Sequence, residues 1–371
     1  MYSRISVLNS RVSQTLMKFR FFAALLPVLL GKEAAAQWRA PKYSNEFLSI
    51  GAGAGGLALA GAQTSCASDV HAGYWNPAGL GLMKGKSQFA LMHASYFAGI
   101  ANYDYAAAAL RVDSLSVLGI SWLRFAVDDI PDTRYLIENG QVDYRRISSF
   151  SSADNAVFFS YGRRMSGIPG LTLGGSMKII YRKAGKFANA WGFGLDAGLC
   201  YSFRNWNLGL FARDVSGTFN AWSYNTTEFE AVFAQTGNAI PLQSVEVTIP
   251  ALAFGISRKL NFWKQRLAIR PSLDLLQTFD GERNTLLHSK AVSVDPRFGL
   301  ETTLFDFVSF RAGLGNMQRT LGFDGAERLS YQLNFGLGLH WKALSLDYAI
   351  TDLGDQSEAL YSHIFSLKAA F

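Results

Sequence analysis

The chain has 371 residues, of which 49% are apolar and 14% aromatic, while only 17% are charged, against about 25% in a typical soluble domain. Its formal net charge of +7 is concentrated at the start, because residues 1–36 hold five of the 35 lysines and arginines and one of the 28 acids. The remainder is nearly neutral, which excludes a basic nucleic-acid surface, and the low charge content predicts a surface that does not wholly face water.

Residues 1–36 have the pattern of a removable export signal. Lys18 and Arg20 precede the apolar run "FFAALLPVLLG", and "AAAQ" follows shortly after it. This run of 11 residues is too short to span a bilayer as a helix. A basic start, a short apolar run and small residues are typical of a secretory signal peptide. We therefore predict cleavage after Ala36 and export from the cytoplasm, and the alternative is a retained amphipathic helix.

Residues 37–85 follow neither a helical nor a strand period. They contain "IGAGAGGLALAGA" (50–62) and "GYWNPAGLGL" (73–82), which are too irregular for a regular element and too apolar for an ordinary surface loop. Glycine lets a backbone turn tightly and approach its neighbours closely. The sequence therefore predicts a compact, non-repetitive segment, whose motif residues are Gly51, Gly53, Gly56, Trp75, Asn76, Pro77, Ala78 and Gly79.

The chemical motifs in the chain are weak. The three glycines at 51, 53 and 56 satisfy G-x-G-x-x-G, but no βαβ unit or suitably placed acid accompanies them. The five histidines lack the spacing of metal ligands, and no Ser/His/Asp set assembles. We therefore predict no cofactor, no metal and no enzymatic activity. Cys66 and Cys200 either form one disulfide in an oxidising compartment or remain two buried thiols.

Beyond residue 85 the apolar residues recur with a period of two. In "YQLNFGLGLHW" (331–341) every second residue is large and apolar or aromatic, and "LSLDYAI" (344–350) repeats the pattern. No apolar run approaches 18 residues, which excludes helical membrane spans. The alternation predicts fourteen strands, near 86–96, 103–112, 114–127, 153–163, 171–183, 189–203, 205–214, 245–257, 266–279, 293–304, 307–316, 328–342, 343–351 and 359–371.

Such strands fit either a half-solvated antiparallel sheet or a transmembrane barrel. Three features favour the barrel: aromatic residues at strand ends, small hydrophilic residues on the polar face, and connections that alternate between short and long. The long connections are near 128–152, 215–244, 280–292 and 317–327. The predicted fold class is therefore all-β, a 14-stranded antiparallel transmembrane β-barrel over residues 86–371.

A barrel of this size gives residues 37–85 a place. Its interior is too wide for its own side chains to fill, and irregular backbone at membrane depth is tolerated only where protein or water surrounds it. We therefore predict that residues 37–85 form an N-terminal hatch, or plug, inside the lumen. The alternative is a cap outside the barrel.

Charged residues on the late strands form a second candidate site. Six of them are predicted to point inward, where they must pair or meet water: Arg266, Arg270, Asp274, Glu301, Arg311 and Asp347. They would either anchor the hatch through salt bridges or line a polar substrate path. A third candidate is the loop 215–244, which is long for an idle connection. Its apolar residues favour a partner or an apolar ligand, or else a short helix over the barrel mouth: Phe229, Val232, Phe233 and Ile240.

The chain ends in "YSHIFSLKAAF", with Phe371 in phase with Leu367, Phe365 and Tyr361. A terminal aromatic residue on an alternating strand resembles the assembly signal of bacterial outer-membrane proteins. This resemblance implies recognition by the barrel-assembly machinery and contact with outer-membrane lipid. The alternative is a plain closing strand.

The segment "KYSNEFLSIGAGAGGLALAGAQTSCASDVHAGYWNPAGL" (42–80) resembles the N-terminal signature of the PorV/PorQ family, a branch of the FadL-like outer-membrane barrels found in the Bacteroidetes lineage. The matching elements are Phe47-Leu48, the small residues of 51–62, Asp69 and "YWNPAGL" (74–80). The rest of the chain agrees only in strand pattern and in its terminal phenylalanine.

The resemblance implies a bacterial outer-membrane location and two different functions. PorV-type members serve type IX secretion, where they sit beside a large translocon and bind the C-terminal signal of exported cargo. FadL-type members carry hydrophobic molecules through a hatch-blocked lumen and an opening in the barrel wall. We predict the PorV-like accessory function, with a FadL-like uptake channel as the alternative and a purely structural envelope protein as a third class. None of the matched residues is a cargo-binding residue.

Overall fold

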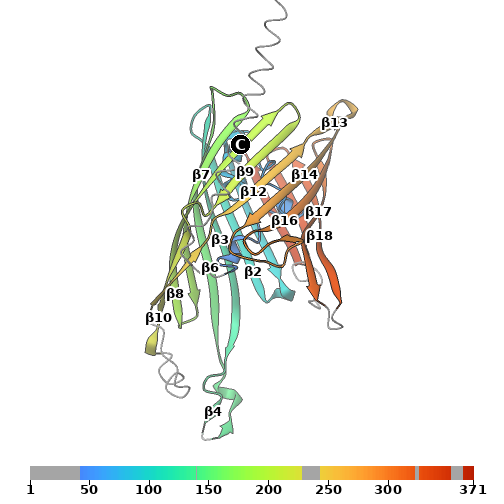
Figure 1. Cartoon of the computed structure of the whole chain (residues 1–371). Helices are drawn as coiled ribbons and strands as arrows, with labels where there is room; N and C mark the ends of the chain where they lie inside the picture. Colours follow the sequence, from blue (N-terminus) through green and yellow to red (C-terminus); the bar gives the residue numbers. More distant parts are fainter. Residues whose placement is uncertain (1–41, 139, 228–242, 322–325, 352–361) are drawn as a thin grey trace, which may run out of the picture. The chain divides into compact units, whose positions relative to one another are not determined.

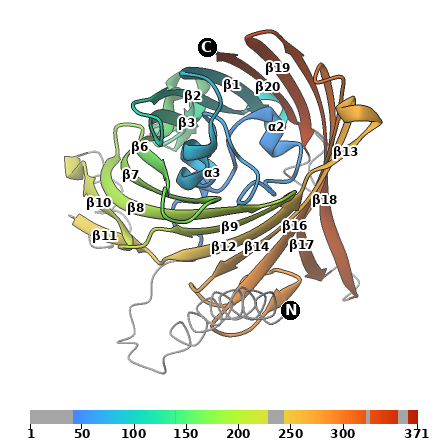
Figure 2. The ribbon, with the colours of Figure 1, turned by 90° about the horizontal axis from the view of Figure 1, so that it is seen from above.

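The strands of the computed structural model form one antiparallel sheet that closes on itself. The structure describes residues 42–371 except 139, 228–242, 322–325 and 352–361. Closure occurs at β1 (Ser87–Tyr96), which pairs with β2 (Ala101–Arg111) on one side and with β20 (Ser362–Ala370) on the other. Figure 2 looks into the resulting ring. The predicted 14-stranded antiparallel barrel is confirmed.

Nine further positions of the ring are single strands that follow the sequence in order. They are β3 (Ser116–Asp132), β6 (Ser148–Arg164), β7 (Leu171–Ala184), β8 (Ala188–Phe203), β14 (Leu267–Thr278), β16 (Ser293–Leu304), β17 (Val308–Leu321), β18 (Glu327–Trp341) and β19 (Leu344–Thr351). Each pairs with its sequence neighbours in the ring. The alternating sequence pattern locates all of these strands, with ends that differ by a few residues.

The remaining two positions of the ring are broken strands. One consists of β9 (Trp206–Arg213) and β10 (Thr218–Tyr224), which pair with successive parts of β8. The other consists of β11 (Gln243–Thr248) and β12 (Ala251–Arg258). The prediction that 215–244 is entirely loop is therefore wrong, because β10 lies within it.

The break between β9 and β10 has a local cause. Asp214 and Gly217 adopt φ values of 56° and 68°, which a strand cannot accommodate. The turned Asp214 carboxylate lies 2.5 Å from Nζ of the buried Lys178, which also contacts Asp196 at 2.8 Å. In the facing strand Pro250 separates β11 from β12, and proline has no N–H to donate to a ladder.

Side chains alternate between the outside and the inside of the ring as predicted. On β18 the large residues at alternate positions are exposed, from 40% for Leu337 to 63% for Trp341, whereas Asn334 between them is 3% exposed. On β19 Leu344 and Leu346 are exposed and Asp347 is buried. The outer surface of the barrel is therefore coated by apolar side chains.

The two ends of the barrel differ in their connections. One end, here called the short-turn end, carries tight turns such as 204–205, 305–307 and 342–343 together with the C-terminus. The other, the long-loop end, carries the hairpin of β4 (Ile137–Glu138) and β5 (Gln141–Val142), which projects from β3 and β6 in Figure 1. Two short pieces extend the sheet, β13 (Leu260–Phe262) and β15 (Leu287–His288).

Helical elements are short and few among the described residues. Three one-turn 3₁₀ helices lie in connections: η4 (Phe97–Gly99), η5 (Tyr144–Arg146) and η6 (Trp263–Gln265). No helix in the described part of the chain has the length and hydropathy to cross a bilayer.

Residues 42–85, here called the inner segment, lie inside the ring in Figure 2. The segment contains η2 (Glu46–Leu48), α2 (Ala54–Leu57), α3 (Ala72–Trp75) and η3 (Pro77–Leu82). Its apolar residues pack against the inward side chains of the early strands, and this is where the hydrophobic core lies: Phe47, Leu48, Tyr74, Trp75, Leu80, Tyr96, Tyr103, Tyr105, Phe158 and Ile180.

The lumenal face is therefore not uniformly hydrophilic. The early strands β1 to β7 present tyrosine, alanine and phenylalanine to the inner segment, whereas β14 to β19 present charged groups. The alternating pattern predicts small hydrophilic inward residues on every strand, and this is wrong for the early strands. Apolar inward residues are tolerated on the early strands because the inner segment, and not water, covers them.

Candidate site in the barrel lumen

The glycine-rich part of the inner segment wraps around one indole ring. Gly51 and Gly53 adopt φ values of 123° and 81°, which favour glycine. A Cβ atom on Gly56 would lie 2.9 Å from Nε1 of Trp75, and that Nε1 donates a 2.8 Å hydrogen bond to the Ala52 carbonyl. Gly51 and Gly56 thus pack against Trp75, which is 6% exposed, whereas Gly53 lies against the ring of His71.

Asn76 connects the inner segment to the barrel wall. It is fully buried, and its Nδ2 lies 2.8 Å from the Thr64 carbonyl, 3.3 Å from that of Leu199 on β8 and 3.4 Å from that of Leu210 on β9. Its Oδ1 accepts from the Ala78 amide, which begins the 3₁₀ turn at Pro77. The Asn-Pro-Ala motif therefore ends α3, starts η3 and holds both against two strands.

Glycines of the wall complete this contact, and they are not among the residues predicted from the sequence. A Cβ atom on Gly162 would lie 2.6 Å from the Pro77 carbonyl oxygen, and Cβ atoms on Gly174 and Gly198 would overlap Pro77–Ala78 and Asn76. The backbone of the inner segment lies directly on these strand positions. Their signal in the sequence is a glycine at an inward position of an otherwise regular strand, which indicates close approach of another backbone.

Four of the six predicted lumenal charges form one network. Glu301 accepts from Arg270 at 2.9 Å and from Arg311 at 2.7 Å, and Arg311 also donates to Asp347 at 2.6 Å. Arg270 additionally donates to the Cys66 carbonyl of the inner segment. The network therefore joins β14, β16, β17 and β19 to the inner segment.

The other two predicted charges lie elsewhere. Asp274 accepts a 2.7 Å hydrogen bond from the Thr64 amide of the inner segment. Arg266 is exposed and precedes β14, at the end of η6. The prediction that Arg266 points inward is wrong, because the strand begins one residue later and the turn leaves its side chain at the rim.

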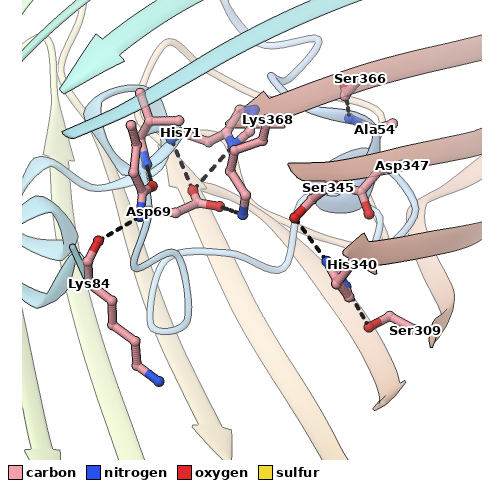
Figure 3. Close-up of polar contacts among 12 residues, drawn as sticks. Ala54, Asp69, His71, Lys84, Ser309, His340, Ser345, Asp347, Ser366 and Lys368 are labelled. Atoms are coloured by element: carbon pink, nitrogen blue, oxygen red, sulfur yellow. Dashed lines mark hydrogen bonds and ion pairs between the residues drawn. The ribbon is translucent and has the colours of Figure 1, made fainter. Parts of the chain in front are cut away.

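A second polar group, half-buried and missed in the sequence, lies between α3 and β20. Figure 3 shows Asp69 between His71 and Lys368. The Asp69 carboxylate contacts Nδ1 of His71 at 3.1 Å and Nζ of Lys368 at 2.5 Å. In the same view Ser366 accepts a 2.7 Å hydrogen bond from the Ala54 amide. These contacts join the inner segment to the last strand, and Asp69 is one of the residues that carry the family resemblance.

The start of the inner segment is attached at the long-loop end. Arg283 bridges Glu46 at 2.9 Å and Asp280 at 2.5 Å, and Asp280 also accepts from the Tyr43 amide. Partial burial favours the neutral carboxyl of Asp280, but the hydrogen bonds and positive charge of Arg283 outweigh it and hold the pKa of Asp280 below its usual range.

Above the inner segment, toward the long-loop end, the lumen contains a cavity of about 740 Å³. Its floor is formed by the inner segment, including Phe47, Ile50 and Leu57. One wall comes from β3, β6, β7, β10 and β11, and the opposite wall from β16 to β19. The residues that line these walls are Phe125, Asp154, Arg182, Trp222 and Glu246 on the first side and Asp295, Arg297, Asn316, Gln332, Asn334 and Thr351 on the second.

Some of the predicted site residues fall outside the part of the chain that the structure describes. The predicted partner-contact residues lie outside the described residues: Phe229, Val232, Phe233 and Ile240. The same is true of the predicted signal peptide, residues 1–36. Cys66 and Cys200 are both buried free thiols. No cluster of potential metal ligands occurs in the part of the chain that the structure describes.

Phe371 follows β20 at the short-turn end. Its ring packs edge-on against Phe89 with a centroid separation of 6.5 Å, and its side chain is 66% exposed. Its backbone N–H donates to the Ser87 carbonyl at 2.8 Å, and its own carbonyl accepts from the Lys86 and Ser87 amides. The last residue therefore helps to close the ring.

Comparison with known proteins identifies the fold. No protein-family model matches the chain, and no curated protein sequence matches it. Among solved structures, the chain is similar to the P. putida toluene transporter TodX, with a TM-score of 0.53, 14% identity and coverage of 86% of this chain and 99% of that one. The Ralstonia pickettii toluene transporter TbuX has a TM-score of 0.51 and 15% identity, with coverage of 86% of this chain and 98% of that one. The monoaromatic hydrocarbon channel CymD has a TM-score of 0.52 and 12% identity, with coverage of 87% of this chain and 98% of that one. The chain therefore has a FadL-like barrel fold.

Proposed function

We propose that this protein is an outer-membrane channel for the uptake of hydrophobic compounds, exported by means of residues 1–36. The observation that carries the proposal is the cavity of about 740 Å³ inside the barrel, on the long-loop side of the inner segment, whose floor includes the apolar side chains of Phe47, Ile50 and Leu57. Its volume lies within the range of small-molecule binding sites. The similar structures are transporters of toluene and related hydrocarbons, which supports the same assignment.

The inner segment acts as the hatch of this channel. It separates the cavity from the short-turn end, where Gly85 lies beside Phe371. Because its core residues are buried and its backbone lies on the wall glycines, a ligand that enters from the long-loop end stops at Phe47, Ile50 and Leu57. Onward movement requires either a shift of the hatch or an opening of the wall.

A cavity-filling variant tests the proposal. Gln332 lines the cavity on β18, and its neighbour Leu333 faces outward and is 42% exposed. Gln332→Trp should reduce the uptake of radiolabelled toluene at least fivefold in a host without its own FadL-type barrels. The control Leu333→Trp adds the same side chain to the lipid-facing surface and should leave uptake unchanged. If cells with the unaltered protein took up no more toluene than cells without it, the proposal would be overturned. An equal loss of uptake in both variants would overturn it as well.

The PorV-like secretion function stays a prediction based on the resemblance of residues 42–80. It differs from uptake in its expected partners, since a secretion accessory should be recovered from native membranes with a large translocon and secreted cargo. Isolation with such partners, combined with no hydrocarbon uptake, would favour secretion over the channel.

A further inference from the structure

We infer that the compound taken up through this cavity is an amphiphile whose head group donates hydrogen bonds and carries no negative charge, such as an amine or an alcohol. The inference rests on the proposed uptake function and narrows its substrate class. It depends on three properties of the cavity. Part of the lining is apolar, the lining arginines are already paired, and the lining carboxylates outnumber the arginines. Two polar oxygen atoms of the lining also lack a hydrogen-bond partner.

The apolar part of the cavity fits a hydrocarbon or aromatic body. Phe47 and Leu57 are 6% and 7% exposed, so the floor is fixed by the hatch core. Phe125 and Trp222 add aromatic surface from β3 and β10. An apolar ligand group placed here would leave water at no cost to a protein polar group.

Arg182 is fully engaged with protein groups. Its guanidinium donates to both oxygens of Asp154, at 3.0 and 3.1 Å, and lies 3.5 Å from Glu246. It also lies over the rings of Phe47 and Trp222, at 5.7 and 5.1 Å. A ligand carboxylate would have to displace one of these acids, and the displaced acid would lose its partner.

Arg297 is the other cation among the described residues that line the cavity, and it is paired as well. Its Nε donates to Oδ2 of Asp295 at 2.9 Å. The two lining arginines face four lining carboxylates, those of Glu46, Asp154, Glu246 and Asp295. Even after Glu46 is assigned to Arg283 at the rim, one more carboxylate than arginine remains. The resulting field opposes an anion and favours a cation.

Two acceptors on the far wall have no partner. Oδ1 of Asp295 and Oγ1 of Thr351 are both buried and form no hydrogen bond in the described structure, and both residues line the cavity. A buried acceptor without a donor is unfavourable, because it has lost its hydrogen bonds to water without replacing them. Because the terminal torsion of an aspartate is soft, Asp295 can turn Oδ1 toward a ligand while its other oxygen keeps Arg297. An ammonium or hydroxyl group can donate to Oδ1 of Asp295, and a carboxylate cannot. The Thr351 hydroxyl both donates and accepts, so it offers a partner to any of these head groups, and the discrimination against an anion rests on Asp295.

Four probes with one phenylbutyl body separate the head groups: 4-phenylbutylamine, 4-phenylbutanol, 4-phenylbutyrate and butylbenzene. Binding to the full-length barrel in detergent is measured by titration calorimetry at neutral pH. The amine should bind at least tenfold more tightly than the acid, with the alcohol between them. Equal or tighter binding of the acid would overturn the inference while leaving the uptake function intact. Failure of all four probes to bind would instead refute the uptake function.

Charge variants identify the residue responsible. Asp295→Asn keeps the shape of the side chain but frees the charge of Arg297, so the preference for amine over acid should fall at least tenfold. The matched control is Asp143→Asn, which makes the same change in the exposed hairpin, where Asp143 pairs with Arg145. Thr351→Val removes one acceptor at nearly constant volume and should weaken the alcohol several-fold. An unchanged preference for amine over acid in Asp295→Asn would contradict the assignment of the head-group site.

Discussion

The side-chain amide of Asn76 donates a 2.8 Å hydrogen bond to the carbonyl of Thr64, twelve residues earlier in the chain. The same nitrogen lies within 3.4 Å of carbonyls on β8 and β9 and 3.3 Å from Sγ of Cys200. Thr64 in turn donates its own amide to Asp274 on β14. One buried side chain therefore connects two parts of the inner segment to each other and to the wall.

Asn76→Ala should loosen the hatch without unfolding the barrel. The substitution leaves the Thr64 carbonyl short of a donor and removes the contacts to two strands, and each buried unsatisfied group is unfavourable by about 1–3 kcal/mol. Hydrogen exchange of the amides in 60–80 should accelerate at least tenfold, while those of β14 to β18 stay protected. The control Asn205→Ala changes an exposed residue in the β8–β9 turn. Equal exchange in both variants would show that Asn76 does not hold the hatch.

Replacement of two neighbouring glycines on β7 by alanine should change the stability of the protein in opposite directions. A Cβ atom on Gly174 would overlap the backbone of Pro77 and Ala78, whereas one on Gly175 would lie 3.4 Å from the nearest atom, the Asp196 carbonyl oxygen. Gly174→Ala should destabilise the protein by about 1–3 kcal/mol through overpacking. Gly175→Ala should be neutral or stabilising by up to about 1 kcal/mol, because it restricts the unfolded chain. Unfolding midpoints in detergent measure both, and a common sign would disprove the close contact.

The strand pattern predicts the barrel well because a ring with lipid outside imposes one rule on every strand. On β18 each second residue from Tyr331 to Trp341 is large, and all of these side chains are exposed. The rule fails where a strand is interrupted for a tertiary reason. The break at Asp214 depends on Lys178 and Asp196, which lie on other strands, so a local pattern cannot reveal it.

Sequence reasoning predicts the site less completely. Asn76 and Trp75 are singled out because they form an irregular motif, and Arg270, Glu301, Arg311 and Asp347 because charge is rare on an inward strand face. The cavity is not predicted, since its lining residues come from nine strands and the inner segment, and only the closed ring brings them together. The group formed by Asp69 and Lys368 is missed for the same reason, as its members are 299 residues apart.

The attachment of the hatch at the long-loop end should weaken in acid. Arg283 holds the pKa of Asp280 below its ordinary value of about 3.9. The stabilisation that the Asp280 carboxylate gives to this attachment is therefore complete above about pH 3.9. It is lost as the pH falls through the lower pKa of the folded state. A spin label can be attached selectively at Lys42→Cys, because both native cysteines are buried. This label should become mobile only below about pH 3.9. In Asp280→Asn the label should be mobile at every pH. A transition at or above pH 3.9 would contradict the stated pairing.

The last residue allows assembly and stability to be separated. The backbone of Phe371 forms three hydrogen bonds with Lys86 and Ser87, and its exposed ring contacts only the edge of Phe89 among the aromatic pairs of the described residues. Phe371→Ala keeps the backbone bonds. It should lower the amount of barrel in the outer membrane several-fold. The free energy of unfolding of the refolded protein should change by no more than about 0.5 kcal/mol, as expected for a surface substitution. Deletion of Phe371 removes the bonds as well and should reduce both quantities. Normal membrane levels of Phe371→Ala would mean that the ring is not the assembly signal and that only the closing strand matters.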